Sequence, residues 1–433
     1  MNQSPTSPSS TARGAHDPKE PARPGGSDGP DGPDGPLGYR DYRLFIGHVF
    51  LTTIVEKSQT VVIGWDLYER TGTALALGWM GLLQFLPVIL LFLPAGQIAD
   101  RFDRRWVVAL SLVAWGASHA ILFYAAVTGA GTAWIYAAAV CIGVAHVINR
   151  PSRDALMPQL LPRSMLGRAI AVGTSLFQTA AIGGPALAGL IIASTHSAAA
   201  AYALNIACTL VAAALVILVR GRDTGRATRP RSLRDLFAGL GHVWRTKEIL
   251  GVMTLDLFAV LFGGATALLP VYAKDILHVG PAGLGWLTAA VSIGALGASV
   301  TQGIRPPFRR QGLAFAWSVA GFGVAIVVFG LSTSFWLSLL ALVAVGALDN
   351  ISVVTRQLVV QFYTPDELRG RVSAVNRVFI SSSNELGAFE SGLLAALTSP
   401  VFTVVFGGLV TVVFVAAGLR HFPALRRMGS LAR

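Results

Sequence analysis

The sequence predicts an all-α membrane protein with twelve transmembrane helices in two six-helix bundles. Of its 433 residues, 53% are hydrophobic and only 13% are charged, whereas a soluble protein usually carries about 25% charged residues. Apolar segments recur along most of the chain, each long enough for the roughly 20 residues that a membrane-spanning helix needs. The second half also repeats features of the first half at an offset of 203 residues. Such a repeat is typical of two related bundles.

The chain opens with a polar segment, residues 1–38, that is rich in Gly, Pro, Ser and Asp. This composition cannot bury enough apolar surface to offset the entropy lost on ordering, so we predict a disordered cytoplasmic tail. We place the first bundle at 39–219, a basic cytoplasmic linker at 220–248, the second bundle at 249–420 and a cytoplasmic tail at 421–433. The predicted spans cover residues 44–68, 75–98, 106–127, 134–157, 166–194, 198–219, 250–272, 284–303, 313–331, 335–360, 372–397 and 402–419.

The distribution of charge predicts the orientation of the chain. The net charge of +12 comes from arginines and lysines concentrated in the linker and in the loops after even-numbered spans. The opposite loops carry only Arg70 and Lys274. This is the positive-inside pattern, so both termini are predicted to be cytoplasmic, and no nucleic-acid partner is expected. In the linker, apolar residues recur at helical spacing, which predicts an amphipathic helix on the membrane surface.

The densest charge cluster between two spans is GQIADRFDRR at residues 96–105. Five of these ten residues are ionic, so the segment must form a turn outside the hydrocarbon. It resembles the loop 2–3 signature of the major facilitator superfamily, G-x-x-A-D-R-x-x-R-R, at every fixed position. The resemblance implies the major facilitator fold, which agrees with the two bundles predicted from hydropathy and from the repeat.

The same resemblance implies a gating role for Gly96, Asp100, Arg101, Arg104, Arg105 and Asp154. Gly96 is expected to allow close helix packing. Asp100 is expected to face the positive N-terminus of the eleventh span, which begins near Arg371, and so to latch the outward-facing state. Arg104 is the second latch residue, with Asp154 as its partner. The alternative is that the arginines only anchor the topology.

Four further segments resemble the drug:proton antiporter-3 branch, which includes enterobactin-exporter-like and macrolide-efflux transporters. They are W-x-x-Y-x-x-T-G at 65–72, P-x-R-x-A-L-x-P at 151–158, TPDELRGR at 364–371 and LRHF at 419–422. The resemblance covers residues 43–423 and implies export activity.

A glycine-rich segment in the fifth span, GGPALAG at 183–189, resembles the antiporter motif of exporters. The match rests on Gly184, Pro185 and Gly189, while Ala180 and Ala188 occupy positions where the motif has glycine. Ordinary packing of small residues between helices is the alternative interpretation.

Ionisable residues inside spans are candidates for function, because a lone charge at the bilayer centre costs at least about 2.5–3.5 kcal/mol. The candidates for proton coupling are Glu56, Glu385, Asp256, Asp349 and His146. The repeat offset places Asp349 opposite His146. The alternatives are a carboxylate permanently neutralised by a basic neighbour and a neutral interior histidine.

Three basic residues within spans are candidates for the substrate cavity, namely Lys57, Arg150 and Arg377. Basic side chains at this depth can attract an anionic substrate or pair with a nearby carboxylate. The sequence leaves both interpretations open.

These observations together predict a proton-coupled exporter that moves an amphipathic small molecule, such as a siderophore or drug, by alternating access. Its expected partners are the substrate, protons and the lipid bilayer of a bacterial inner membrane, and we expect a monomer. The sequence holds no phosphate-binding loop, no metal-ligand spacing and no catalytic constellation, so we expect no cofactor, no metal and no enzymatic activity. The alternatives are an importer or lipid translocator on the same fold, or a membrane scaffold or sensor that transports nothing.

Overall fold

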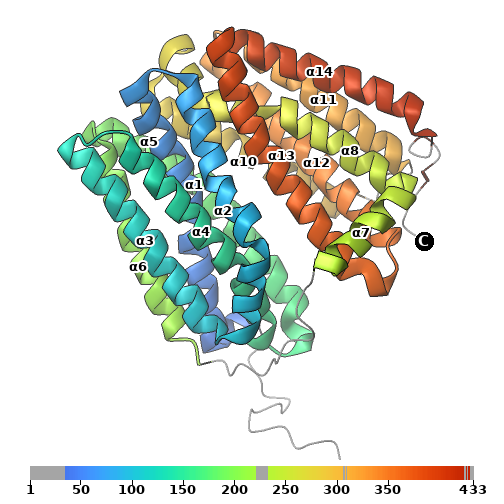
Figure 1. Cartoon of the computed structure of the whole chain (residues 1–433), viewed down its shortest axis with the longest axis horizontal. Coiled ribbons are helices and arrows are strands. Elements are labelled where there is room, and N and C mark those ends of the chain that lie inside the picture. Colours follow the sequence, from blue (N-terminus) through green and yellow to red (C-terminus); the bar gives the residue numbers. More distant parts are fainter. Residues whose placement is uncertain are drawn as a thin grey trace, which may run out of the picture.

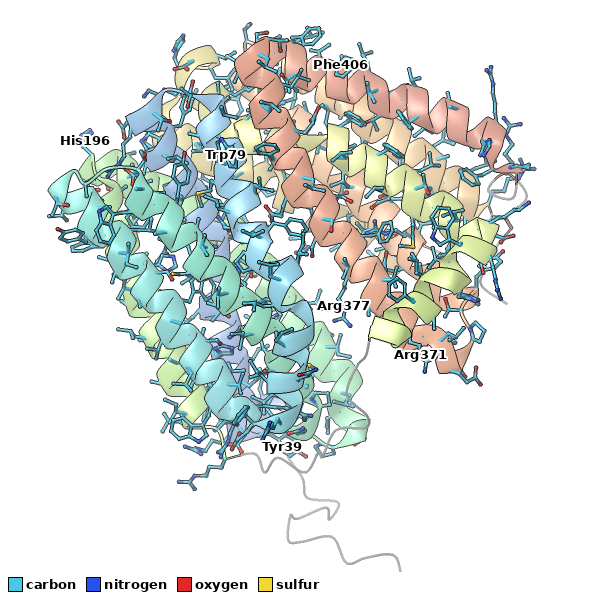
Figure 2. All side chains as sticks on the ribbon, in the orientation of Figure 1. Tyr39, Trp79, His196, Arg371, Arg377 and Phe406 are labelled. Carbon is cyan, nitrogen blue, oxygen red and sulfur yellow. The ribbon has the colours of Figure 1, made fainter. Side chains whose placement is uncertain are left out.

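The computed structural model describes residues 35–220, 233–305, 308, 310–423, 426 and 428–429, apart from a few side chains within helices. All regular structure in this part of the chain is helical. Figure 1 shows two groups of helices, α1–α6 and α7–α14, which meet at one end and diverge toward the other. Tyr39, which precedes the first long helix, lies at the diverging end (Figure 2).

The first bundle is made of six long helices joined by short turns. They are α1 (Arg40–Thr71), α2 (Ala74–Arg101), α3 (Arg104–Thr128), α4 (Ala133–Leu156), α5 (Leu166–Thr195) and α6 (Ala198–Ile217). The turn after α1 needs Gly72, which adopts a left-handed φ of 62° and donates its N–H to the Tyr68 carbonyl. A residue with a Cβ adopts this conformation only at a cost. Ser197 caps α6 by accepting a hydrogen bond from the Ala199 N–H.

The second bundle follows an additional helix, α7 (Leu233–Arg245), that lies within the predicted linker. Its membrane-spanning elements are α8 (Lys247–Phe262) with η4 (Gly264–Leu268), α9 (Leu269–Val271) and η5 (Tyr272–Ile276), then α10 (Gly280–Ile304), α11 (Gln311–Leu331), α12 (Phe335–Phe362), α13 (Arg369–Leu397) and α14 (Pro400–His421).

The seventh span is interrupted, whereas the sequence predicted one continuous helix. The interruption falls where two glycines meet neighbouring helices. A Cβ at Gly263 would stand 2.7 Å from the ring of Phe322, and a Cβ at Gly264 would stand 2.5 Å from Ser391 Oγ. Pro270 follows on α9 and cannot donate a backbone hydrogen bond. The span therefore changes its helical geometry where other helices approach most closely.

Ten helices within the described part of the chain are long and apolar enough to cross a membrane. The two long helices outside this set, α1 and α13, contain charged residues in mid-helix, among them Glu56 and Lys57 on α1 and Arg377 and Glu385 on α13. With these two helices the structure has the twelve predicted spans. Cys141 and Cys208 are both free cysteines.

The two bundles contact each other through α5 with α10 and through α2 with α13. At the first contact, a Cβ at Gly189 would lie 2.4 Å from the Pro281 carbonyl oxygen and 3.0 Å from Gly285 Cα. At the second, a Cβ at Gly392 would lie 2.8 Å from Gly78 Cα. These residues lie toward the end where α1 finishes and α2 begins, which we call the outer end. The molecule is therefore closed at its outer end.

We expect Gly189→Leu to prevent this closure, because any side chain at this position would force α5 away from the Pro281 carbonyl on α10. The distance between spin labels at Ser194→Cys and Thr333→Cys, two exposed positions on outer turns of the two halves, should increase and can be measured by double electron–electron resonance. The matched control is Gly183→Leu on the same helix, where no described atom lies within 4 Å of a Cβ. Equal distances in both variants would contradict the prediction.

Candidate functional site

A cluster of polar residues lies between α1, α3 and α4 of the first bundle. Glu56 Oε1 accepts a hydrogen bond from Arg150 Nη2 at 3.0 Å. His146 lies one turn before Arg150 on α4, within electrostatic range of Glu56. Its ring meets Trp115 edge-on, with 4.5 Å between the ring centroids. Trp115 Nε1 donates to Gln59 Oε1 at 2.9 Å, so hydrogen bonding from α1 orients the indole beneath His146.

Lys57 completes this cluster from the neighbouring position on α1, and it too lies within electrostatic range of Glu56. The antiporter-like segment of α5 explains how close the backbones come here. A Cβ at Gly184 would stand 2.8 Å from the Ile54 carbonyl oxygen and 3.1 Å from Lys57 Cβ. Small residues at Gly184 and Gly189 thus allow α5 to approach α1 on one side and α10 on the other.

Glu385 lies on α13 where the second bundle meets the first. Its Oε2 is 3.3 Å from the position that a Cβ at Gly81 on α2 would occupy. One turn farther toward the outer end, Trp79 meets Phe389 edge-on at 5.2 Å between centroids (Figure 2). Arg150 lies within electrostatic range of Glu385. The Arg150 guanidinium, which pairs with Glu56, therefore also interacts electrostatically with the Glu385 carboxyl group of the second bundle.

Two other candidates lie apart from this cluster. Asp349 on α12 is half-buried, and no hydrogen bond or ion pair joins it to another described residue. Its neighbour Asn350 accepts hydrogen bonds from Ser299 and Gln302, both at 3.1 Å. Arg377 is exposed and lies on the side of α13 that faces the first bundle (Figure 2).

Asp256 on α8 forms an ion pair with Arg356 on α12. Both side chains are almost fully buried, with 7% and 3% of their surfaces exposed, and Ser352 Oγ donates to Asp256 Oδ1 at 3.3 Å. Asp256 was a candidate for proton coupling, but this geometry favours the alternative of a carboxylate neutralised by a basic neighbour. The repeat aligns Arg356 with Arg153. In the structure, Arg153 Nη2 forms an ion pair with Asp154 Oδ1 at 3.5 Å.

The charged turn at 96–105 ties helices of the first bundle together. Arg105 Nη2 pairs with Asp103 Oδ2 at 3.1 Å, and its Nη1 donates to the Val219 carbonyl after α6 at 2.7 Å. Burial alone would raise the pKa of Asp103, but the hydrogen bonds and charge of Arg105 lower it below the ordinary value. Arg104 is 9% exposed, and Arg101 is exposed.

The predicted latch would join Asp100, near the end of α2, to the start of α13. The side chain of Asp100 lies outside the described residues. Arg371, at the start of α13, contacts α7, where a Cβ at Gly239 would stand 2.8 Å from the Arg371 carbonyl oxygen. No described atom lies within 4 Å of the Cβ position of Gly96, so this conformation does not show the close helix packing predicted there. The physical reason is the divergence of the bundles at this end (Figure 1).

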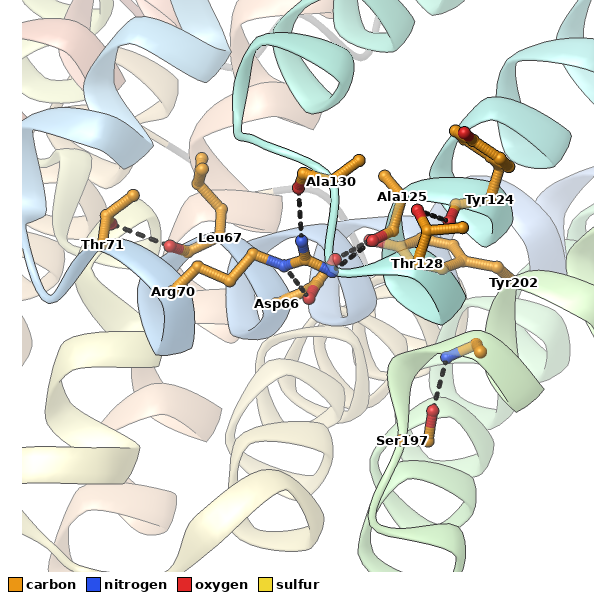
Figure 3. A network of polar contacts seen from close by, with 11 residues as sticks. Asp66, Leu67, Arg70, Thr71, Tyr124, Ala125, Thr128, Ala130, Ser197 and Tyr202 are labelled. Atoms are coloured by element: carbon orange, nitrogen blue, oxygen red, sulfur yellow. Dashed lines mark hydrogen bonds and ion pairs between the residues drawn. The ribbon is translucent and has the colours of Figure 1, made fainter.

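A polar network at the outer end of the first bundle was not predicted (Figure 3). Arg70 Nε pairs with Asp66 Oδ1 at 2.7 Å, and Tyr202 on α6 donates to Asp66 Oδ2 at 3.2 Å. Arg70 also donates to the carbonyl groups of Ala125 and Ala130 at 3.1 and 2.9 Å. The network joins α1, α6 and the α3–α4 turn. Arg70 is one of two basic residues in the outer loops. This exception to the charge pattern was the sequence feature that could have indicated a structural role for Arg70.

A second unpredicted contact joins the two halves at the outer end. The Tyr68 hydroxyl, near the end of α1, donates a hydrogen bond to Asp275 Oδ2 on η5. Lys274 Nζ lies 5.7 Å from the centroid of the Tyr68 ring, a cation–π distance. Tyr68 belongs to the W-x-x-Y-x-x-T-G segment, but nothing in the sequence alone indicated Asp275 as its partner.

We expect Tyr68→Phe to shift the protein away from the outer-closed conformation. A hydrogen bond to a charged group contributes about 1.5–3 kcal/mol, so the ratio of closed to open should fall about tenfold or more. The distance distribution between labels at Ser194→Cys and Thr333→Cys reports this ratio. Tyr124→Phe is the control, because Tyr124 is exposed near the outer end of α3 and its hydroxyl bonds no other described residue. An unchanged distribution in Tyr68→Phe would refute the prediction.

The family model of the Major Facilitator Superfamily matches residues 45–388, a range that includes Glu56, Arg150, Glu385 and the charged turn. The chain belongs to this superfamily. It is therefore a multi-pass membrane protein and a secondary transporter, and not an enzyme. Its partners include a small-molecule substrate and the membrane.

Curated relatives of this major facilitator include the "Enterobactin exporter EntS" of Escherichia coli strain K12, which is 25% identical over 334 residues, covering 76% of this chain and 80% of the relative. EntS of Shigella dysenteriae serotype 1 strain Sd197 has the same identity and coverage.

Solved structures of other transporters share the fold of this major facilitator. The nucleoside transporter NupG superposes with a TM-score of 0.70 at 11% identity, covering 88% of this chain and 100% of the other. A POT family transporter in complex with a thioalcohol-conjugated peptide superposes with a TM-score of 0.70 at 13% identity, covering 89% of this chain and 96% of the other. A bacterial homologue of the human lysosomal transporter Spinster superposes with a TM-score of 0.66 at 12% identity, covering 90% of this chain and 98% of the other. At these identities the likeness shows the fold alone.

Proposed function

We propose that this transporter is a proton-coupled antiporter that exports an amphipathic small molecule, such as a siderophore or drug, from the cytoplasm. The observation that carries the proposal is the position of Arg150. It pairs with Glu56 in the first bundle at 3.0 Å and lies within electrostatic range of Glu385 in the second. The Arg150 guanidinium stays charged throughout. It can therefore interact with two carboxyl groups, one on each side of the interface between the bundles.

The competition for Arg150 gives a means of coupling protons to conformation. While Glu385 holds a proton it is neutral, and Arg150 remains on Glu56 within its own bundle. When Glu385 loses its proton, its carboxylate competes for Arg150 and favours an ion pair that crosses the bundles. A proton on Glu385 therefore has different interaction energies in different bundle arrangements, which is what allows it to shift their populations.

The cationic side chains of the interface are the proposed contacts for the substrate. Lys57 and Arg150 belong to the first bundle, and Arg377 faces that bundle from α13 (Figure 2). A substrate with acidic or electron-rich groups that contacts Arg150 would enter the competition between Glu56 and Glu385. Export and a siderophore substrate are supported by the relationship to EntS, so enterobactin is the first compound to test.

The test uses inside-out membrane vesicles from cells that produce the transporter, with an acidic interior and no sodium. Export predicts that enterobactin accumulates in these vesicles and that an uncoupler abolishes the accumulation. Vesicles from cells lacking the protein are the control. Accumulation that survives the uncoupler would contradict proton coupling, and accumulation only in right-side-out vesicles would establish an importer. Absence of transport for enterobactin and a panel of amphipathic drugs would favour the scaffold or sensor.

The gating part of the proposal concerns the charged turn. In the present conformation the outer end is closed, and the Arg371 end of α13 lies against α7. We propose that in the opposite conformation the cytoplasmic ends approach, so that Asp100 contacts the start of α13 and Arg104 pairs with Asp154, with Gly96 allowing the helices to meet. Arg101 and Arg105 then stabilise the turn that presents this latch.

A further inference from the structure

A groove lies between α8 and α14, at the end of the second bundle where α14 finishes. We call it the α8–α14 groove, and it is lined by Thr254, Leu255, Phe414, Ala417, Gly418, Arg420, His421 and Phe422. Its volume is about 540 Å³. The end of α14 lies on the side of the second bundle away from the first (Figure 1). The groove is therefore separate from the interface that holds Glu56, Arg150 and Glu385.

Most of the residues that line this groove are apolar. Phe414 stacks on Phe258 of α8 with 4.4 Å between centroids. Because Gly418 has no side chain, Leu255 can lie directly against the α14 backbone, 2.4 Å from where a Cβ would stand. The face of α14 that continues from the groove is exposed and apolar, with Leu409 52% and Val413 64% exposed. In a membrane-spanning helix such a face contacts acyl chains.

The mouth of the groove carries positive charge at the end of the last membrane-spanning helix. Arg420 and His421 form the last turn of α14 and are both exposed. None of the eight described residues that line the groove is acidic, and Glu248, at the start of α8, lies within electrostatic range of Tyr363, just after α12. A guanidinium at the end of a span can bind phosphate oxygens through two hydrogen bonds. The groove thus offers an apolar channel that ends in an anion-binding group.

We propose that the α8–α14 groove binds an anionic phospholipid of the cytoplasmic leaflet. Its acyl chain lies along Phe414 and Ala417, and its phosphate contacts Arg420. The charge of the mouth favours anionic over zwitterionic headgroups, because each basic residue near the membrane surface adds to the attraction. A lipid in this position bridges the first and last spans of the second bundle and stabilises their packing.

The test is native mass spectrometry of the full-length protein, released from detergent after titration with phosphatidylglycerol or with phosphatidylcholine of the same acyl chains. We expect preferential retention of phosphatidylglycerol and about fivefold weaker retention in Arg420→Gln. The matched control is Arg305→Gln, which removes an exposed arginine at the same end of the second bundle, after α10. It should retain the lipid as the wild type does.

A second pair of variants tests the apolar channel without changing charge. Ala417→Trp should fill the groove and abolish selective retention, whereas Ala416→Trp places the same side chain at an exposed position that does not line the groove. Thermal unfolding shows whether each tryptophan variant folds. If Ala417→Trp does not fold, the lipid retention of Arg420→Gln alone decides whether the proposal holds. Equal retention of both phospholipids by the wild type, or wild-type retention in both Arg420→Gln and Ala417→Trp, would overturn the proposal.

Discussion

Glu385→Gln is expected to reduce gradient-driven accumulation of substrate to the level of the wild type treated with an uncoupler. Glutamine has nearly the same shape as protonated glutamate but can neither release nor accept a proton in this range of pH. It fits beside Gly81 on α2, where Glu385 Oε2 lies, so the contact between α2 and α13 should persist. Exchange of labelled for unlabelled substrate, which needs no net proton movement, should continue. Both rates can be measured in the same inside-out vesicles.

The control for this variant is Glu390→Gln, five residues later on α13. Glu390 Oε2 accepts a hydrogen bond from Ser391 Oγ at 3.4 Å, and it lies nearer the outer end than Glu385. Its neutralisation changes the charge of the helix equally but should leave gradient-driven accumulation intact. If Glu385→Gln accumulates substrate as the wild type does, Glu385 is not the coupling residue.

Glu56→Gln separates the two carboxyl groups. Removing this charge frees Arg150, so that Glu385 competes for it without opposition. Within the coupling scheme, Glu56→Gln should therefore favour the arrangement with Arg150 bridging the bundles, and it should lower transport by holding the cycle in one state. The two variants differ in exchange activity, which is retained in Glu385→Gln and reduced in Glu56→Gln.

The fold could be predicted because a bilayer imposes simple rules on length and charge. These rules located α1 and α13 despite their mid-helix charges, since each lies between turns at the required spacing. They could not locate the interruption of the seventh span. That feature depends on Phe322 and Ser391, which reach Gly263 and Gly264 only once the helices have packed.

The candidate site was predicted as separate residues, and the structure supplies their pairing. Glu56 and Arg150 were candidates for different roles, and the ion pair between Arg150 on α4 and Glu56 on α1 makes them partners. Hydropathy treats each span alone, so it could not distinguish Arg150, which faces the interface, from Arg356, which is buried within a bundle. The hydrogen bond from Tyr68 to Asp275 joins residues of different halves, and no local pattern encodes it.

Arg356→Met is expected to destabilise the second bundle strongly. It removes the partner of Asp256 at a site where both side chains are almost fully buried, and breaking a buried pair in this way costs about 3–5 kcal/mol. The hydrogen bond from Ser352 cannot neutralise the charge that remains. Reversible unfolding in mixed micelles measures the difference. The exposed pair of Arg369 with Asp366, at 2.8 Å, is the control, and Arg369→Met should cost less than about 1 kcal/mol.

The double variant Asp256→Leu with Arg356→Met distinguishes an unpaired charge from lost packing. If the large cost of Arg356→Met comes from the stranded carboxylate, replacing both partners by apolar residues should recover most of the stability, because an apolar pair of similar volume needs no desolvation of charge. If Asp256 instead exchanges protons during transport, the double variant would regain stability but lose proton coupling. Retained coupling together with recovered stability would assign the pair a purely structural role and leave Glu385 with Arg150 as the coupling site.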